Sequence, residues 1–228
     1  MCNYFKIDNE TWRFEDGFVR FFLLKGTECA VMIDSGMTKN NARALCESMT
    51  ELPITLINTH GDTDHVSGTG AFDEIHIGMA DFNNCRLAER FPDTRPLPLS
   101  DGQVIDLGGR RLKAIYIPGH TKGSFAFLDM DRRRLFAGDT VQDDDIFLFG
   151  SHRDKDKLAD SLKKLIEMQS EYDEIIASHG EVILPADYPK KVLHSWQKVM
   201  DGEIEGIDME MHGNPVQLYK TESCGFIL

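Results

Sequence analysis

Four apolar segments of this 228-residue chain each end in histidine or aspartate, with glycine or proline beside them. Residues 54–59 lead into 60–65 (HGDTDH), and the other three segments lead into residues 118–121, 138–140 and 179–180. Short apolar runs bounded by such residues are typical of buried β-strands, because glycine and proline let the chain turn sharply. A strand holds the side chain at its end rigidly while the following loop stays accessible. The pattern therefore predicts a ligand site assembled from several strand ends.

The side chains at these strand ends predict a metal centre. Imidazole and carboxylate groups are ligands of zinc, iron and manganese. Seven such groups are too many for one tetrahedral ion and suit two ions, about 3.5–4 Å apart, that share a bridging carboxylate. A single histidine or Gly-Asp pair is more often an ordinary turn residue, but four such strand ends together favour metal. The candidate ligands are His60, Asp62, Asp64, His65, His120, Asp139 and His179.

The wider pattern of the chain predicts an α/β fold with mixed sheets covered by helices. Apolar residues at helical spacing predict helices around residues 42–49, 158–166 and 192–200. We find neither a repeat nor a Ser/Pro-rich linker, so residues 1–228 are interpreted as a single domain. Strand-like runs occupy residues 18–24, 30–33, 54–58, 112–117, 124–128, 134–137, 174–177 and 215–219.

Charge and composition narrow the classes of partner. The formal net charge of −13 disfavours nucleic acid or an anionic membrane as a partner, because both require a basic surface. With 41% hydrophobic and 28% charged residues, the composition is typical of a globular protein, and we expect a small-molecule substrate. The five cysteines form no C-x-x-C pair, and the N-terminal residues do not resemble a signal peptide, so we expect a cytoplasmic location. The oligomeric state is left open.

The order of the motifs resembles the metallo-β-lactamase-fold superfamily, also called the metallo-hydrolase/oxidoreductase fold. The resemblance covers residues 18–180, including Asp34-Ser35-Gly36 after an early strand. It implies an αββα sandwich of two mixed β-sheets flanked by helices, with a dinuclear metal site at the sheet edge. It also implies one ion bound by His60, residue 62 and His120, a second bound by Asp64, His65 and His179, and Asp139 as the bridge.

The chain departs from this family at position 62, where the usual residue is histidine and this chain has aspartate. Two divalent ions carry a charge of about +4, and three carboxylates with a bridging hydroxide carry about −4, so the net charge of the centre is about zero. With histidine at position 62, the net charge would be about +1. Asp62 therefore predicts a weaker Lewis acid and a higher pKa for bound water. It also makes the ligand set harder, so iron or manganese becomes plausible beside zinc. Flavo-diiron members of the family have glutamate at this place, although this sequence shows no flavodoxin domain.

The expected chemistry is metal-dependent hydrolysis of a small-molecule ester-type bond by a metal-bridging hydroxide. Thioesters and lactones are favoured over β-lactams, and phosphoesters are also considered, so the substrate stays unknown. Asp64 and Asp139 are the expected catalytic residues, with Asp64 orienting the nucleophile. Two alternatives remain open, namely a non-haem di-iron oxidoreductase of the same fold and a non-catalytic metal-binding protein.

Residues 143–153 (DDDIFLFGSHR) are the expected substrate-contacting segment, because an apolar run with a polar end follows the bridging aspartate. Phe147, Phe149, His152 and Arg153 are the candidate contacts, with His152 as a proton donor to the leaving group. The alternative is that the two phenylalanines pack under a helix while Arg153 pairs with a carboxylate. Asp34 is expected either to orient a ligand histidine from behind or to cap the turn that follows it.

Overall fold

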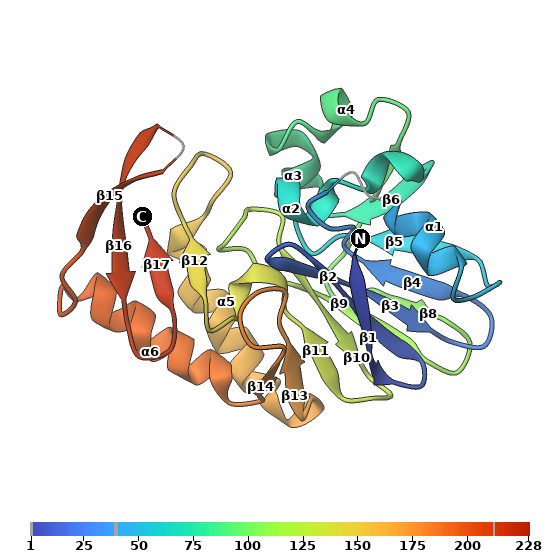
Figure 1. Ribbon diagram of the computed structural model, residues 1–228. Helices are drawn as coiled ribbons and strands as arrows, with labels where there is room; N and C mark the ends of the chain where they lie inside the picture. The colour runs from blue at the N-terminus through green and yellow to red at the C-terminus, as the bar shows by residue number, and fades with distance from the viewer. Residues whose placement is uncertain (1, 39–40, 212) are drawn as a thin grey trace.

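The computed structural model describes residues 2–38, 41–211 and 213–228, and in these ranges the strands form three sheets (Figure 1). The seven-stranded sheet contains, in spatial order, β1 (Asn3–Asp8), β2 (Thr11–Asp16), β3 (Val19–Lys25), β4 (Ala30–Ile33), β5 (Ile54–Ile57), β6 (Glu74–Ile77) and β7 (Arg95–Pro98). The six-stranded sheet contains β14 (Ile183–Pro185), β13 (Glu174–Ile176), β11 (Arg134–Phe136), β10 (Phe125–Asp129), β9 (Arg111–Tyr116) and β8 (Val104–Asp106). The four-stranded sheet contains β12 (Asp145–Phe147), β17 (Gly225–Ile227), β16 (Asn214–Lys220) and β15 (Ile207–Met211).

The first two sheets pack face to face, which explains why the central strands β3, β4 and β10 each contain an unbroken run of apolar residues. On β3, Phe22 and Leu24 point into the core between the two sheets, while Phe21 and Leu23 point into the core under the helices. Strands β4 and β10 alternate in the same way. A strand that is buried on both faces reads as a continuous apolar run, because successive side chains point to opposite faces.

Helices cover the two outer faces. The seven-stranded sheet packs against α1 (Ala42–Glu47), α3 (Met79–Asn84) and α4 (Leu87–Arg90), and the short helix α2 (Thr63–Val66) lies at its edge. The six-stranded sheet packs against α5 (Lys155–Glu167) and α6 (Tyr188–Met200). The spacing of Leu158, Leu162 and Leu165 puts these side chains on the buried face of α5. The predicted αββα sandwich of mixed sheets is confirmed.

The four-stranded sheet was not predicted as a sheet. Only residues 215–219 were expected to form a strand there, and the structure adds β15, β17 and β12. β12 lies within the expected substrate-contacting segment and pairs in parallel with β17 at the end of the described chain. Figure 1 shows β15, β16 and β17 beside α6, on the side away from α1. A strand of three residues has no periodicity to detect, so only its distant partner identifies β12.

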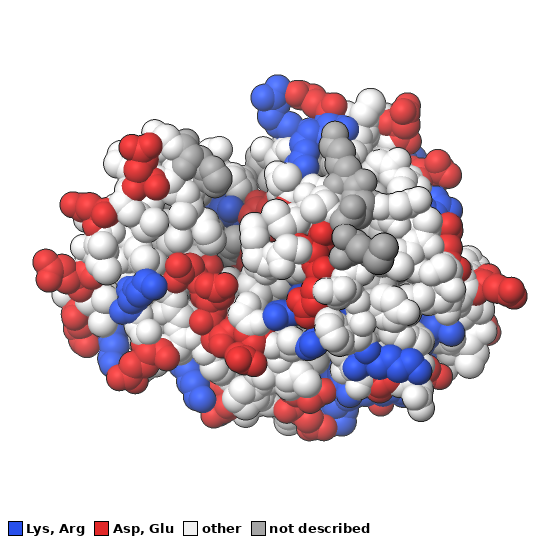
Figure 2. All heavy atoms as spheres, viewed as in Figure 1, with Lys and Arg blue, Asp and Glu red and all other residues white. Residues whose placement is uncertain are grey.

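Charged side chains of both signs are mixed over the face of the molecule shown in Figure 2. Within the described ranges, none of the helices combines the length and the apolar character that crossing a bilayer requires.

Candidate metal centre

The loops that follow the central strands bring the predicted ligands together. Because β4 is parallel to β5, and β11 to β13, the chain leaves each pair of strands at the same edge. These exits carry side chains that face the centre, the loop after β9 adds His120, and α2 adds two more. Their donor atoms form two groups in which every pair of atoms lies within 4.8 Å: Asp64, His65, Asp139 and His179, and His60, His120 and Asp139.

Backbone carbonyls set the tautomer of two of the histidines. Nδ1 of His179 lies 2.9 Å from the carbonyl oxygen of Phe18, and Nδ1 of His120 lies 3.0 Å from that of Phe147. A carbonyl oxygen only accepts hydrogen bonds, so each Nδ1 must carry the proton. The Nε2 atom of each neutral ring therefore presents a lone pair to the centre, which is the form that binds metal.

Asp34 sets the tautomers of the other two histidines. Its Oδ2 lies 2.8 Å from Nδ1 of His65 and accepts a 2.7 Å hydrogen bond from the Thr59 hydroxyl. Because Thr59 donates to Asp34, its oxygen must accept from Nδ1 of His60, which lies 3.0 Å away. Of the two roles expected for Asp34, the structure therefore shows contact with a candidate ligand histidine. The left-handed backbone of Asp34, with φ of 62°, is one that aspartate and asparagine tolerate.

The Nε2 atoms face one another in pairs, and this arrangement fits a cation. His60 and His120 are separated by 3.2 Å at Nε2, and His65 and His179 by 3.3 Å. Asp139 lies between the pairs, with Oδ1 3.2 Å from Nε2 of His65 and Oδ2 3.6 Å from Nε2 of His120. Oδ1 of Asp139 is buried and forms no hydrogen bond. Facing lone pairs beside a buried carboxylate repel one another unless protons or a metal ion neutralise them.

The half of the site around Asp64, His65, Asp139 and His179 attracts positive charge. Burial alone would lower the pKa of His179, but the carboxylates of Asp139 and Asp64 outweigh it and raise that pKa to about 10. The pKa of the buried His65 is raised by the same carboxylates. Although burial favours the neutral acid, the histidines hold the pKa of Asp139 well below its usual range. Two protons or one divalent ion would supply the missing charge.

Metal binding to the metal-free protein at about pH 8 is therefore expected to release at least one proton per ion. His179, whose pKa is raised to about 10, still holds its proton at this pH, and a metal ligand must lose its proton from Nε2. Isothermal titration calorimetry in two buffers of different ionisation enthalpy measures the number released. Release near zero would show that His65 and His179 are neutral before the ion binds.

Asp62 lies at the edge of the other half and has basic neighbours. Its Oδ2 is 3.2 Å from Nε2 of His120 and 2.7 Å from Nη2 of Arg153, and its Oδ1 is 3.3 Å from Nε2 of His152. Although burial raises the pKa of Asp62, the neighbouring histidines His120, His152 and His60 hold it well below the usual range. Burial and the Arg153 guanidinium lower the pKa of His120 to about 4. Asp62 occupies the N-cap position of α2, but its side chain makes no capping hydrogen bond.

A cavity of about 710 Å³ opens above these side chains. Its lining includes three of the four predicted substrate contacts, namely Phe147, His152 and Arg153. Phe149 packs with Phe147 against the four-stranded sheet, not under a helix as the alternative had it. Sequence reasoning missed the apolar part of the lining, because no local sequence pattern marks these residues. They are Phe18, Met37, Met209, Met211 and Ile227. Figure 2 shows the surface hollowed between the C-terminal strands and the rest of the molecule.

Sequence reasoning also missed Asp81, a buried carboxylate at the start of α3. It accepts hydrogen bonds from the backbone nitrogens of Gly61, at 2.9 Å, and Gly123, at 2.7 Å. The Thr121 hydroxyl donates to it at 2.6 Å. Asp81 therefore ties the loop that carries His60 to the loop that follows His120. An isolated aspartate in a helix shows no sequence signal for such a role.

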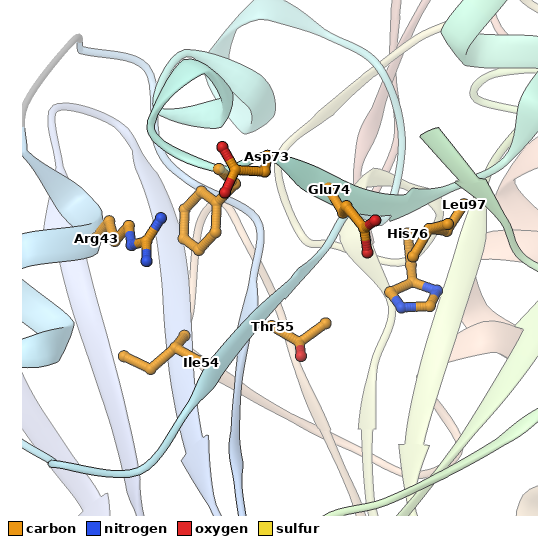
Figure 3. Close-up of a pocket in the computed structure, with 8 residues that line it drawn as sticks. Arg43, Ile54, Thr55, Asp73, Glu74, His76 and Leu97 are labelled. Atoms are coloured by element: carbon orange, nitrogen blue, oxygen red, sulfur yellow. The ribbon is translucent and has the colours of Figure 1, made fainter. Parts of the chain in front are cut away.

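A second pocket, of about 360 Å³, lies away from this centre. Figure 3 shows Glu74 and His76 of β6 facing it, together with Thr55 of β5. Nδ1 of His76 is buried there without a hydrogen bond, and burial lowers the pKa of this histidine. Among the described residues, no group of three metal-ligating side chains has its donor atoms close together there, so this pocket is not a competing metal centre.

Asp34→Asn is expected to lower the affinity for Zn²⁺ by about 10–100-fold, because an amide oxygen orients His65 more weakly than a carboxylate does. Asparagine suits the backbone at this position, so the fold should be retained. Competition with a chromophoric chelator measures the affinity, and Asp73→Asn at an exposed position is the control. An unchanged affinity in Asp34→Asn would mean that Asp34 supports only the fold.

The comparisons with known proteins point to one family. A family model described as the metallo-beta-lactamase superfamily matches residues 15–179. Acyl-coenzyme A thioesterase MBLAC2 from Homo sapiens is 27% identical over 161 residues, covering 54% of this chain and 58% of that protein. Hydroxyacylglutathione hydrolase from Gloeobacter violaceus is 30% identical over 130 residues, covering 56% of this chain and 50% of that protein. The chain thus spans about half the length of these curated relatives.

Solved structures share the fold at low identity. A metallo-beta-lactamase from Pontibacter korlensis superimposes with a TM-score of 0.71 at 18% identity, covering 86% of this chain and 99% of that one. A metallo-beta-lactamase family protein from Thermus thermophilus gives a TM-score of 0.62 at 22% identity, covering 82% of this chain and 77% of that one. These likenesses concern architecture alone.

Proposed function

The chain belongs to the metallo-β-lactamase superfamily, and from this premise we propose that it is a metal-dependent hydrolase of a small-molecule ester-type bond. The observation that carries the proposal is the convergence of four Nε2 atoms and the Asp139 carboxylate at the base of a partly apolar cavity. Such a site offers metal ligands, room for a substrate and apolar walls in one place.

Zinc is the proposed metal, with iron or manganese as alternatives. Asp64, His65, Asp139 and His179 would hold it in one half of the centre, and His60 and His120 offer two further nitrogens in the other half. When bound, the metal supplies a Lewis acid and lowers the pKa of water toward neutrality. The carboxylates would keep the ion bound, while Asp34 and the backbone carbonyls hold the imidazoles in their metal-binding tautomers.

Two further side chains have proposed roles in the reaction. Asp64 lies 3.4 Å from Nε2 of His179 at the cavity and would orient the attacking water as well as hold the ion. His152 lines the cavity, and its Nε2 lies 3.3 Å from Oδ1 of Asp62. A carboxylate that holds the ring in place makes His152 a proposed proton donor to the leaving group.

Thioesters are the substrate class that we propose first. The names of two relatives describe a thioesterase and a hydroxyacylglutathione hydrolase. The cavity walls carry Phe18, Met209 and Met211, and the flexible, polarisable methionine side chains adapt to acyl chains and sulfur. Lactones, β-lactams and phosphoesters remain in the proposal as less favoured classes. The oxidoreductase alternative depended on Asp62 as a hard ligand, and the pairing of Asp62 with Arg153 weakens it.

A substrate panel tests the proposal. The zinc-loaded protein is assayed with chromogenic thioesters, lactones, β-lactams and phosphodiesters, and the chelated protein is the control. We expect turnover of at least one class that chelation abolishes and zinc restores. Tight zinc binding without turnover of any class would favour the non-catalytic alternative. Oxygen consumption by an iron-loaded sample would favour the oxidoreductase.

A further inference from the structure

Arg153 places its guanidinium among the donor atoms that would hold a first metal ion. Nη2 of Arg153 lies 2.7 Å from Oδ2 of Asp62, and Nη1 lies 2.8 Å from Nε2 of His120. Nη1 also donates to the backbone carbonyl of His120 at 3.2 Å. Nη1 lies 3.4 Å from Nδ1 of the same ring, so the guanidinium lies over the His120 ring and not on the in-plane axis of the Nε2 lone pair. The positive charge of Arg153 therefore lies beside the Nε2 atom that a first metal ion would use.

The backbone around Arg153 is bonded to the loop that carries His120. The nitrogen of Lys122 donates to the carbonyl of His152 at 2.9 Å, and the nitrogen of Asp154 donates to the carbonyl of Gly119 at 2.9 Å. These two bonds bracket Arg153 on both sides. Its side chain is only 9% exposed. The guanidinium is thus positioned by the fold, unlike a surface arginine that samples many rotamers.

The two halves of the centre differ in charge. In the first half, the positive charge of Arg153 balances the negative charge of Asp62 before any ion is present. In the second half, Asp64 and Asp139 bring two negative charges, and within the described ranges their ion pairs are with histidines only. A divalent ion would neutralise the second half, whereas in the first half it would meet a fixed cation at close range.

We infer that Arg153 takes the place of the first metal ion, so that the centre binds one divalent ion, at Asp64, His65, Asp139 and His179. The guanidinium supplies the positive charge beside Asp62 and His120. The aspartate at position 62 fits this arrangement, because a carboxylate pairs with arginine whereas histidine would not. The inference rests on the proposed metal centre, specifies its stoichiometry, and differs from the two-ion expectation from sequence.

Metal content per chain tests the inference. The full chain and its variants are incubated with excess Zn²⁺, passed through a desalting column and analysed by mass spectrometry for zinc. We expect about one ion per wild-type chain, and about two per chain of Arg153→Met, which removes the charge but keeps much of the volume. Arg153→Lys retains a cation and should hold about one ion. Arg95→Met, which breaks an exposed pair with Glu74, is the matched control and should also hold about one.

Each outcome has a distinct meaning. Two ions in the wild-type chain overturn the inference and leave the proposed hydrolase intact. One ion in a folded Arg153→Met variant shows that the guanidinium is not what excludes the second ion. No zinc in any of these chains overturns the proposed metal centre itself. Should Arg153→Met fail to fold, anomalous scattering at the zinc edge from wild-type crystals decides, since a peak between His60 and His120 contradicts the inference.

Discussion

Asp139→Asn is expected to lower kcat/KM on the substrate found in the panel on the order of 10³-fold, the largest effect on activity that we predict. The Asp139 carboxylate faces both histidine pairs, with Oδ1 3.2 Å from Nε2 of His65 and Oδ2 3.3 Å from Nε2 of His179. Asparagine preserves the shape but removes the negative charge that would hold the ion. The loss should therefore appear in both zinc content and turnover.

Steady-state kinetics at saturating zinc separates the activity lost through weak zinc binding from the activity lost in the reaction itself, because excess zinc restores only the first. Circular dichroism establishes that the variant is folded. Asp131→Asn is the matched control, since Asp131 pairs with Arg111 at the surface. If Asp139→Asn retained wild-type turnover and zinc content, the carboxylate would have no part in the reaction and the catalytic interpretation would fail.

Arg110→Ala is expected to lower the free energy of unfolding by about 3–5 kcal/mol, the largest effect on stability that we predict. The side chains of Arg110 and Asp129 are 2% and 0% exposed, and Nε of Arg110 lies 2.9 Å from Oδ2 of Asp129. Arg110 also donates to the carbonyl of Glu10 and to the Thr11 hydroxyl, both at 2.8 Å, and so joins the six-stranded sheet to the seven-stranded one. Its loss leaves the Asp129 carboxylate buried without its counter-ion.

Urea unfolding followed by circular dichroism measures this change. The neighbouring residue provides the control, because Arg111 is 51% exposed and pairs with Asp131 at the surface. Arg111→Ala is expected to cost less than about 1 kcal/mol, since solvent screens an exposed ion pair. Equal effects of the two substitutions would mean that burial of the Arg110 pair contributes nothing particular to stability.

The strands that carry the candidate ligands were predictable because they are buried on both faces. Residues 30–33 were predicted as they are observed in β4, and residues 54–58 differ from β5 by one residue. The edge strands β1 and β8 and the three-residue strand β14 were missed. Each is partly or wholly exposed or too short for a periodic pattern, so the strands beside it determine its conformation more than its own sequence does.

The sequence by itself determined which chemical groups stand at the ends of the buried strands, because apolar runs, turn residues and donor side chains are local features. The order of those features also carried the resemblance to the family, and that resemblance implied the αββα architecture. Only the tertiary structure decided that Arg153 pairs with Asp62, that Asp34 orients His65, and that Met209 and Met211 line the cavity. These contacts join residues far apart in the chain, and the packing of loops and of the third sheet brings them within a few ångströms. No spacing in the sequence encodes such a distance.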